Sequence, residues 1–161
     1  AVKFCNKVFA IADATRSLSG SGVRLIWLDA DVVTHKSVPI SILEWVLPVG
    51  EHISYLDRGR YHSECGIVGY DLRVPEVRAF IDRFASAYSE DAVFKMSEWH
   101  DSFVFDQVRN SMRDKLRFYK MPHHGSSQPF NRSELRNFLV HLKGDLKVHY
   151  ADSSKLGTSG L

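Results

Sequence analysis

Hydrophobic residues recur along the chain in two patterns, one with the period of an amphipathic helix and one of short continuous runs. The helical period begins at once, with apolar side chains three and four residues apart at Val2, Cys5, Val8, Phe9 and Ala12. This spacing predicts an opening helix that ends before the Ser-Gly repeat of residues 19–22. Residues 23–28 are almost all apolar, which is typical of a strand buried on both faces, as in a parallel sheet covered by helices.

The middle of the chain repeats both patterns over shorter segments. Pro39 suits the first turn of a short helix that runs through Trp45 and Leu47. Residues 53–56 alternate between apolar and polar side chains, which predicts a short strand. Residues 65–70 form another apolar run, and its glycines indicate a close approach of backbone or ligand.

Two longer helices are predicted in the second half of the chain. The first begins near Pro75, and its core-facing stripe consists of Val77, Phe80, Ile81, Phe84 and Tyr88. The second begins near Asp101, whose carboxylate can cap free backbone amides. Residues 122–128 have the composition of a loop. Residues 137–142 fit either a buried strand or the end of a helix that starts near Ser133.

The composition is that of a single globular domain, with 44% hydrophobic and 25% charged residues among 161. The 21 basic and 19 acidic residues are spread evenly, so no basic stripe points to nucleic-acid binding. No apolar run approaches the roughly 20 residues that span a bilayer. The two cysteines lack CxxC spacing and the sequence does not open with a signal peptide, so we expect a reducing, cytoplasmic location.

The sharpest chemical feature is Asp29-Ala30-Asp31, which places two carboxylates where the apolar run of residues 23–28 ends. Ligands of open α/β sheets bind at the carboxyl ends of strands. Two carboxylates there can hold Mg²⁺ or Mn²⁺ and leave coordination positions for substrate phosphates. An Asp-x-Asp triplet alone is more often a solvated turn, and the buried strand in front of this one favours a metal site.

A second group of polar residues lies near the other end of the chain. The imidazole of His141 can complete a metal site, Gly144 lets backbone approach a phosphate, and Lys147 supplies a mobile cation. Each of these residues alone is more often a solvated or hydrogen-bonded group. Their significance comes from their pairing with Asp29 and Asp31.

These two groups resemble motifs of the GT-A glycosyltransferases, especially the glycogenin-like and bacterial lipopolysaccharide galactosyltransferase-like retaining enzymes. Asp29-Ala30-Asp31 resembles their metal-binding Asp-x-Asp, and His141, Gly144 and Lys147 resemble their late His-x-x-Gly-x-x-Lys motif. The resemblance implies Asp29, Asp31 and His141 as ligands of Mn²⁺ or Mg²⁺. It also implies that Gly144 and Lys147 contact the diphosphate of a nucleotide sugar, with a UDP-sugar as the expected donor and an unknown acceptor.

The resemblance extends to the sugar site of the same family. Residues 62–69 are similar to the Gly-containing turn that lines this site, although the usual Asn before the Gly is absent. Asp101 resembles the acidic residue that opens a helix beside the donor sugar. Asp101 and Glu64 are therefore the candidate catalytic residues. A glycosidase-like pair of these two carboxylates is the alternative, and the two metal-binding aspartates favour transfer over hydrolysis.

The fold that the resemblance implies is α/β of the GT-A, Rossmann-like type, with a mixed sheet flanked by helices. We expect it to occupy residues 1–152, with a flexible tail at residues 153–161. The first strand–helix units of the family have no counterpart here, so we expect an N-terminally incomplete domain. A sheet that lacks these neighbours has an open edge, which predicts self-association or a partner that covers it.

Three further readings remain open. A sugar nucleotidyltransferase would share the metal site, but it should have a Gly-rich phosphate loop after its first strand, which the sequence lacks. The hypothesis of a noncatalytic module, which keeps the fold only for binding, is favoured by the incompleteness of the domain. A zinc site that joins Cys65 to His100, His123 and His124 has no recognisable ligand spacing.

Overall fold

The computed structural model describes residues 2–18, 20, 22–125 and 127–143. The α-helices are α1 (Val2–Ser17), α2 (Ile40–Val46), α3 (Pro75–Ser89) and α4 (Asp101–Ser111). The 3-10 helices are η1 (Ala92–Lys95), η2 (Phe130–Arg132) and η3 (Glu134–Asn137). The strands are β1 (Arg24–Leu28), β2 (Val32–Thr34), β3 (Ile53–Leu56), β4 (Glu64–Asp71), β5 (Phe118–Lys120) and β6 (Leu139–His141).

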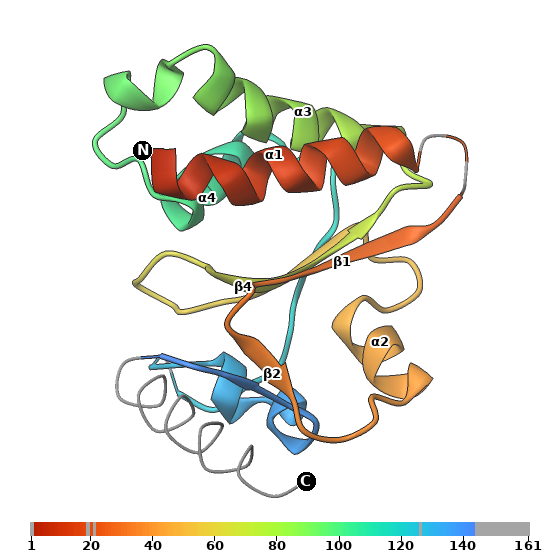
Figure 1. Cartoon of the computed structure of the whole chain (residues 1–161). Helices are drawn as coiled ribbons and strands as arrows, with labels where there is room; N and C mark the ends of the chain where they lie inside the picture. The colour runs from red at the N-terminus through yellow and green to blue at the C-terminus, as the bar shows by residue number, and fades with distance from the viewer. Residues whose placement is uncertain (1, 19, 21, 126, 144–161) are drawn as a thin grey trace, which may run out of the picture.

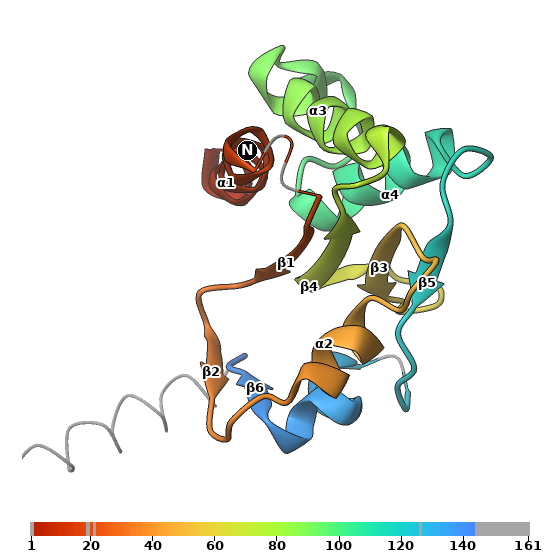
Figure 2. The same ribbon diagram turned by 90° about the vertical axis from the view of Figure 1, so that its right-hand side faces the viewer.

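The main sheet is mixed and has four strands in the order β1-β4-β3-β5. Strand β4 is antiparallel to both β1 and β3, whereas β3 and β5 are parallel. Helices α1, α3 and α4 cover one face of this sheet, and the opposite side carries α2 and a small antiparallel sheet of β2 and β6 (Figures 1 and 2). The protein is therefore α/β with a mixed sheet flanked by helices, an arrangement compatible with a Rossmann-like fold.

The helical periods and the short strands predicted from the sequence are confirmed. Pro39 is the N-cap residue of α2, Pro75 is the first residue of α3, and the predicted stripe of α3 is buried. The stretch before His141 contains both predicted alternatives in succession, because η3 ends at Asn137 and β6 begins two residues later at Leu139. The predicted tail at residues 153–161 lies outside the described residues. Within those residues, no helix is both long and apolar enough to cross a membrane.

Strand β1 differs from its prediction. It is not a central strand of a parallel sheet but an edge strand, paired antiparallel with β4 from Arg24↔Asp71 to Leu28↔Ile67. Its residues are only partly buried, and Leu28 is 40% exposed. Among the described residues no strand pairs with its outer edge. An apolar run favours a buried strand, but it carries no information on the direction or number of the neighbouring strands.

The start of α4 also differs in one respect. The helix begins at Asp101 as predicted, but its N-cap is His100, whose Nδ1 accepts the backbone N–H of Phe103 at 3.2 Å. The carboxylate of Asp101 is therefore not needed for the cap and makes an ion pair elsewhere. A histidine with an unprotonated Nδ1 can accept an amide hydrogen bond as a capping Ser or Asp does.

Two hydrophobic clusters fix the sheet between its layers. On the helical side, α1, α3 and α4 pack on β3 and β4 around Phe80, whose ring lies 5.3 Å from Phe105 and 6.1 Å from Phe118. On the other side, a smaller cluster joins α2, η2 and β6 to the sheet through residues such as Ile67 and Phe130. The sheet is thus anchored from both faces, which holds the ends of β1, β4 and β6 in place.

We predict that Phe80→Ala lowers the free energy of unfolding by about 3–5 kcal/mol, because it leaves a cavity at the centre of the larger cluster. Chemical denaturation of the purified chain measures this change. The matched control is Phe94→Ala, since Phe94 is 60% exposed and its loss should change stability by less than about 0.5 kcal/mol. Equal effects of the two substitutions would contradict the described packing.

Candidate functional site

A cleft of about 1010 Å³ opens at the end of β1. It lies where the start of β4, the first turns of α1 and α4, and the end of β6 come together. Its lining includes five of the residues singled out in the sequence, which are Asp29, Asp31, Glu64, Asp101 and His141. Basic side chains line it too, namely Lys3, Lys7, Arg58 and Lys143. The cleft therefore gathers chemically active residues from four parts of the chain.

Backbone hydrogen bonds hold Asp29 and Asp31 at the C-terminal end of β1. The Asp29 N–H donates to Gly66 O at 3.0 Å and so extends the pairing of β1 with β4 beyond Leu28. The Asp31 carbonyl accepts the N–H of Leu142 at 2.9 Å, which ties the turn after β1 to the end of β6. The indole N–H of Trp27 donates to Asp29 Oδ1 at 2.8 Å and orients that carboxylate.

His141 is held from three sides and is only 2% exposed. Its backbone exchanges two hydrogen bonds of 2.9 Å with the side-chain amide of Asn131, and its ring packs edge-on against Phe130. Gly66 makes room for the ring, because a Cβ at that position would lie 2.6 Å from Cε1 and 2.7 Å from Nδ1 of His141. The glycine in the predicted strand of residues 65–70 thus allows the close approach of an imidazole.

The side chains of Asp29, Asp31 and His141 converge, and each offers a ligand atom within 4.8 Å of the other two. Nε2 of His141 lies 2.9 Å from Asp31 Oδ1, so a proton or a cation must separate the imidazole lone pair from the carboxylate. The other ring nitrogen, Nδ1, has no hydrogen-bond partner among the described residues and faces Glu64 Oε1 at 3.8 Å. This is the geometry in which Nε2 can bind a metal while Nδ1–H points toward a carboxylate.

The donor set fits the divalent cation that the sequence analysis expects. Carboxylate oxygens are the preferred ligands of Mg²⁺ and Mn²⁺, and an imidazole is compatible with Mn²⁺. Burial, together with the ammonium group of Lys143, lowers the pKa of His141, and the carboxylates of Glu64 and Asp31 only partly oppose this. A lowered pKa keeps the imidazole neutral and able to act as a ligand near pH 7.

Two lysines balance the carboxylates around this cluster. Nζ of Lys7 lies 2.8 Å from Asp29 and 2.5 Å from Asp101, so it bridges the end of β1 to the start of α4. Burial by itself would lower the pKa of Lys7, but the charges of Asp101 and Asp29 raise it overall, and the ammonium stays protonated. Lys143 makes the corresponding contact with Glu64 at 2.6 Å. Each candidate catalytic carboxylate is thus paired with an ammonium group.

The structure brings together five of the seven predicted site residues, and the other two, Gly144 and Lys147, lie outside the described residues. Sequence reasoning missed Lys7, because a lysine on an amphipathic helix gives no sign of the aspartates that it will meet. The zinc set built on Cys65 is not assembled. His123 instead contacts the carbonyls of Asp57 and Gly125, and the groups suited to a metal among the described residues do not include Cys65.

No protein-family model matches the chain, and the search of curated proteins also found no match. The class of the protein therefore rests on the fold and the site alone. They define an α/β protein with a cleft at a strand end, in which two aspartates and a buried histidine form a candidate divalent-metal centre.

The lowered pKa of His141 predicts a specific pH dependence of stability in the metal-free chain. An unfolded histidine takes up a proton near pH 6.5, whereas folded His141 does so only at lower pH. The unfolded state then binds more protons, so the free energy of unfolding falls as pH decreases from about 6.5, by at most about 1.4 kcal/mol per unit, until folded His141 also titrates.

This pH dependence can be measured by urea denaturation with a chelator between pH 8 and pH 5. His141→Gln should remove the contribution of His141 to this pH dependence. Over this range the free energy of unfolding of the variant should therefore fall by roughly 1 kcal/mol less than that of the wild type. His124→Gln is the matched control, because His124 is exposed and should keep the wild-type slope. An identical slope in His141→Gln would show that the histidine titrates normally.

Proposed function

We propose that this chain carries the metal- and diphosphate-binding part of a GT-A type glycosyltransferase, which takes a sugar from a nucleotide-diphospho-sugar of the UDP class. The observation that carries the proposal is the convergence of Asp29, Asp31 and His141 in one cleft. Asp101 and Glu64 line the same cleft. These five residues come from four distant parts of the sequence, and the motif resemblance required Asp29, Asp31 and His141 to meet.

The cleft also suits an anionic donor. A divalent cation at the three ligands would offset the charge on a diphosphate leaving group. Basic side chains line the same space, among them Arg58, whose Nε is buried without a hydrogen-bond partner among the described residues. A buried, unsatisfied guanidinium N–H is costly, and a phosphate oxygen is the acceptor that it pairs with best. Arg58 is therefore a plausible contact for the diphosphate.

In this proposal Asp101 acts beside the transferred sugar. It lies in the first turn of α4, is largely buried in the cleft wall, and is held by Lys7. The same lysine contacts Asp29, so it couples the position of Asp101 to that of the metal-binding turn. An ionised carboxylate at this place would orient a donor hydroxyl or stabilise positive charge at the anomeric carbon. Glu64, held by Lys143, is the second candidate for this role.

The first test is binding of Mn²⁺, followed by electron paramagnetic resonance of the free ion. We expect one bound Mn²⁺ per chain, and we expect Asp29→Asn and Asp31→Asn each to weaken binding at least tenfold, about 1.4 kcal/mol. UDP should tighten Mn²⁺ binding by contributing phosphate oxygens. Asp13→Asn is the matched control, because its side chain is 75% exposed on α1. Wild-type Mn²⁺ affinity in both cleft variants would rule out the proposed centre.

The second test addresses Asp101. In protein that turns over a UDP-sugar, Asp101→Asn should lower kcat at least a hundredfold, because the group acts only on the reacting sugar. The affinity for UDP with Mn²⁺ should change by less than about threefold. Asp114→Asn, at a side chain that is 92% exposed, controls for a general effect of lost charge. Unchanged turnover in Asp101→Asn would transfer the catalytic assignment to Glu64.

A further inference from the structure

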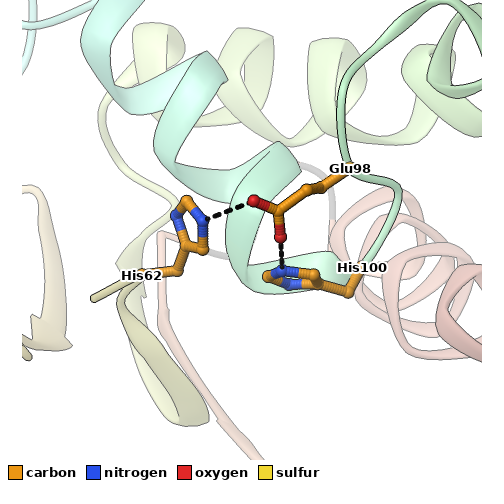
Figure 3. Close-up of side chains that lie close together, drawn as sticks. All are labelled: His62, Glu98 and His100. Atoms are coloured by element: carbon orange, nitrogen blue, oxygen red, sulfur yellow. Dashed lines mark hydrogen bonds and ion pairs between the residues drawn. The ribbon is translucent and has the colours of Figure 1, made fainter.

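A second cluster of metal-ligating side chains lies outside the ligands of the first. It consists of His62, in the loop between β3 and β4, and of Glu98 and His100, between η1 and α4 (Figure 3). Glu98 lies between the two rings, 3.3 Å from His62 Nε2 and 2.7 Å from His100 Nε2. Each residue offers a ligand atom within 4.8 Å of the others. The rings of His62 and His100 contact each other edge-on, with their centroids 5.1 Å apart.

The tautomer of His62 is set by a buried carboxylate. Its Nδ1 lies 3.3 Å from Asp106 Oδ2. Asp106 is itself held by the amide and the hydroxyl of Ser63, and by the guanidinium of Arg109 at 3.1 Å. A carboxylate with these donors remains an acceptor, so Nδ1 of His62 carries the proton. This is the outer carboxylate–histidine pair that commonly orients an imidazole toward a metal.

The other ring nitrogen of His62, Nε2, then carries no proton and faces the carboxylate of Glu98. A neutral imidazole has one N–H, and Asp106 takes it, so the Nε2 lone pair points at Glu98 Oε1. The hydrogen bond that His100 donates lowers the pKa of Glu98, which keeps that carboxylate ionised. A lone pair facing an anion is repulsive unless a cation lies between them. The arrangement therefore has a place for either an added proton or a metal ion.

His100 can complete such a site by giving up one proton. Its Nδ1 accepts the amide of Phe103, so its Nε2–H donates to Glu98 Oε2. A metal at Nε2 would displace that proton, which leaves to solvent or moves to Nδ1 in place of the cap. Solvent can take up the displaced proton, since the His100 side chain is 31% exposed. A metal–imidazole bond is stronger than the single amide hydrogen bond that such a shift would cost.

We propose that His62, Glu98 and His100 form a second metal site, which binds Zn²⁺ in preference to Mg²⁺. Two imidazoles and one carboxylate are borderline ligands that suit Zn²⁺, whereas Mg²⁺ prefers oxygen ligands throughout. The Glu98 side chain is 48% exposed, so a fourth coordination position is open to water. This site is independent of the proposed transferase function.

An ion bound at this cluster would link two segments that form the walls of the cleft. His62 lies two residues before Glu64, and His100 lies directly before Asp101. An ion held by His62 and His100 would therefore tie the start of β4 to the start of α4. Both segments carry carboxylates of the cleft, so Zn²⁺ at the second site would fix the two walls relative to each other.

The test is titration of the chain with Co²⁺ and Zn²⁺ in an Asp31→Asn background, where the first site is weakened. We expect one Co²⁺ per chain with visible absorption bands, displaced by Zn²⁺ and not by Mg²⁺. His62→Ala and Glu98→Gln should weaken Zn²⁺ binding at least tenfold. His124→Ala, at an exposed histidine outside the cluster, should leave it unchanged.

Thermal denaturation supplies a second readout that does not depend on absorption. Zn²⁺ should raise the Tm of the Asp31→Asn chain and not that of the same chain with Glu98→Gln, whose exposed position leaves the fold intact. Equal Zn²⁺ affinity with and without His62→Ala and Glu98→Gln would overturn the proposal. So would the absence of Zn²⁺ binding at micromolar concentration.

Discussion

The antiparallel pairing of β1 with β4 is the constraint on which the site depends. Because the strands run in opposite directions, the end of β1 lies beside the start of β4, and the Asp29–Gly66 hydrogen bond carries this pairing one residue past Leu28. Asp29 and Glu64 are thereby brought to one edge of the sheet. In a parallel pair, residues at the end of one strand would meet the end of its neighbour instead. The direction of β4 thus decides which carboxylates share the cleft.

The second constraint is the absence of a side chain at Gly66. The ring of His141 occupies the space that a Cβ would take, so the end of β6 can approach the main sheet closely enough to place Nε2 beside Asp31. Burial there has an electrostatic result as well, since it lowers the pKa of His141 and keeps a neutral imidazole next to two aspartates. Gly66 therefore affects both the packing of His141 and its protonation.

The parts of the fold that were predicted from the sequence are those set by local spacing. The stripe of α3 repeats every three or four residues, and Asp29 and Asp31 follow an apolar run directly, so both could be read without any distant contact. The edge position of β1 could not be predicted in this way, because an apolar run does not indicate which strands pair with it. The pairing of His62 with Glu98 likewise joins residues 36 positions apart, and it depends on how the loop after β3 packs against the start of α4.

The charges of the cleft explain why one centre could serve both a cation and an anion. The carboxylates of Asp29, Asp101 and Glu64 make ion pairs with the ammonium groups of Lys7 and Lys143, and Asp31 lies against the imidazole of His141. With His141 neutral, a divalent cation held by Asp29, Asp31 and His141 would add positive charge at the point where two carboxylates converge. Arg58, whose Nε has no hydrogen-bond partner among the described residues, lines the same cleft. In the proposed transferase, metal binding should therefore precede or accompany binding of the anionic donor, because the cation balances carboxylate charge that would repel the phosphates of the donor.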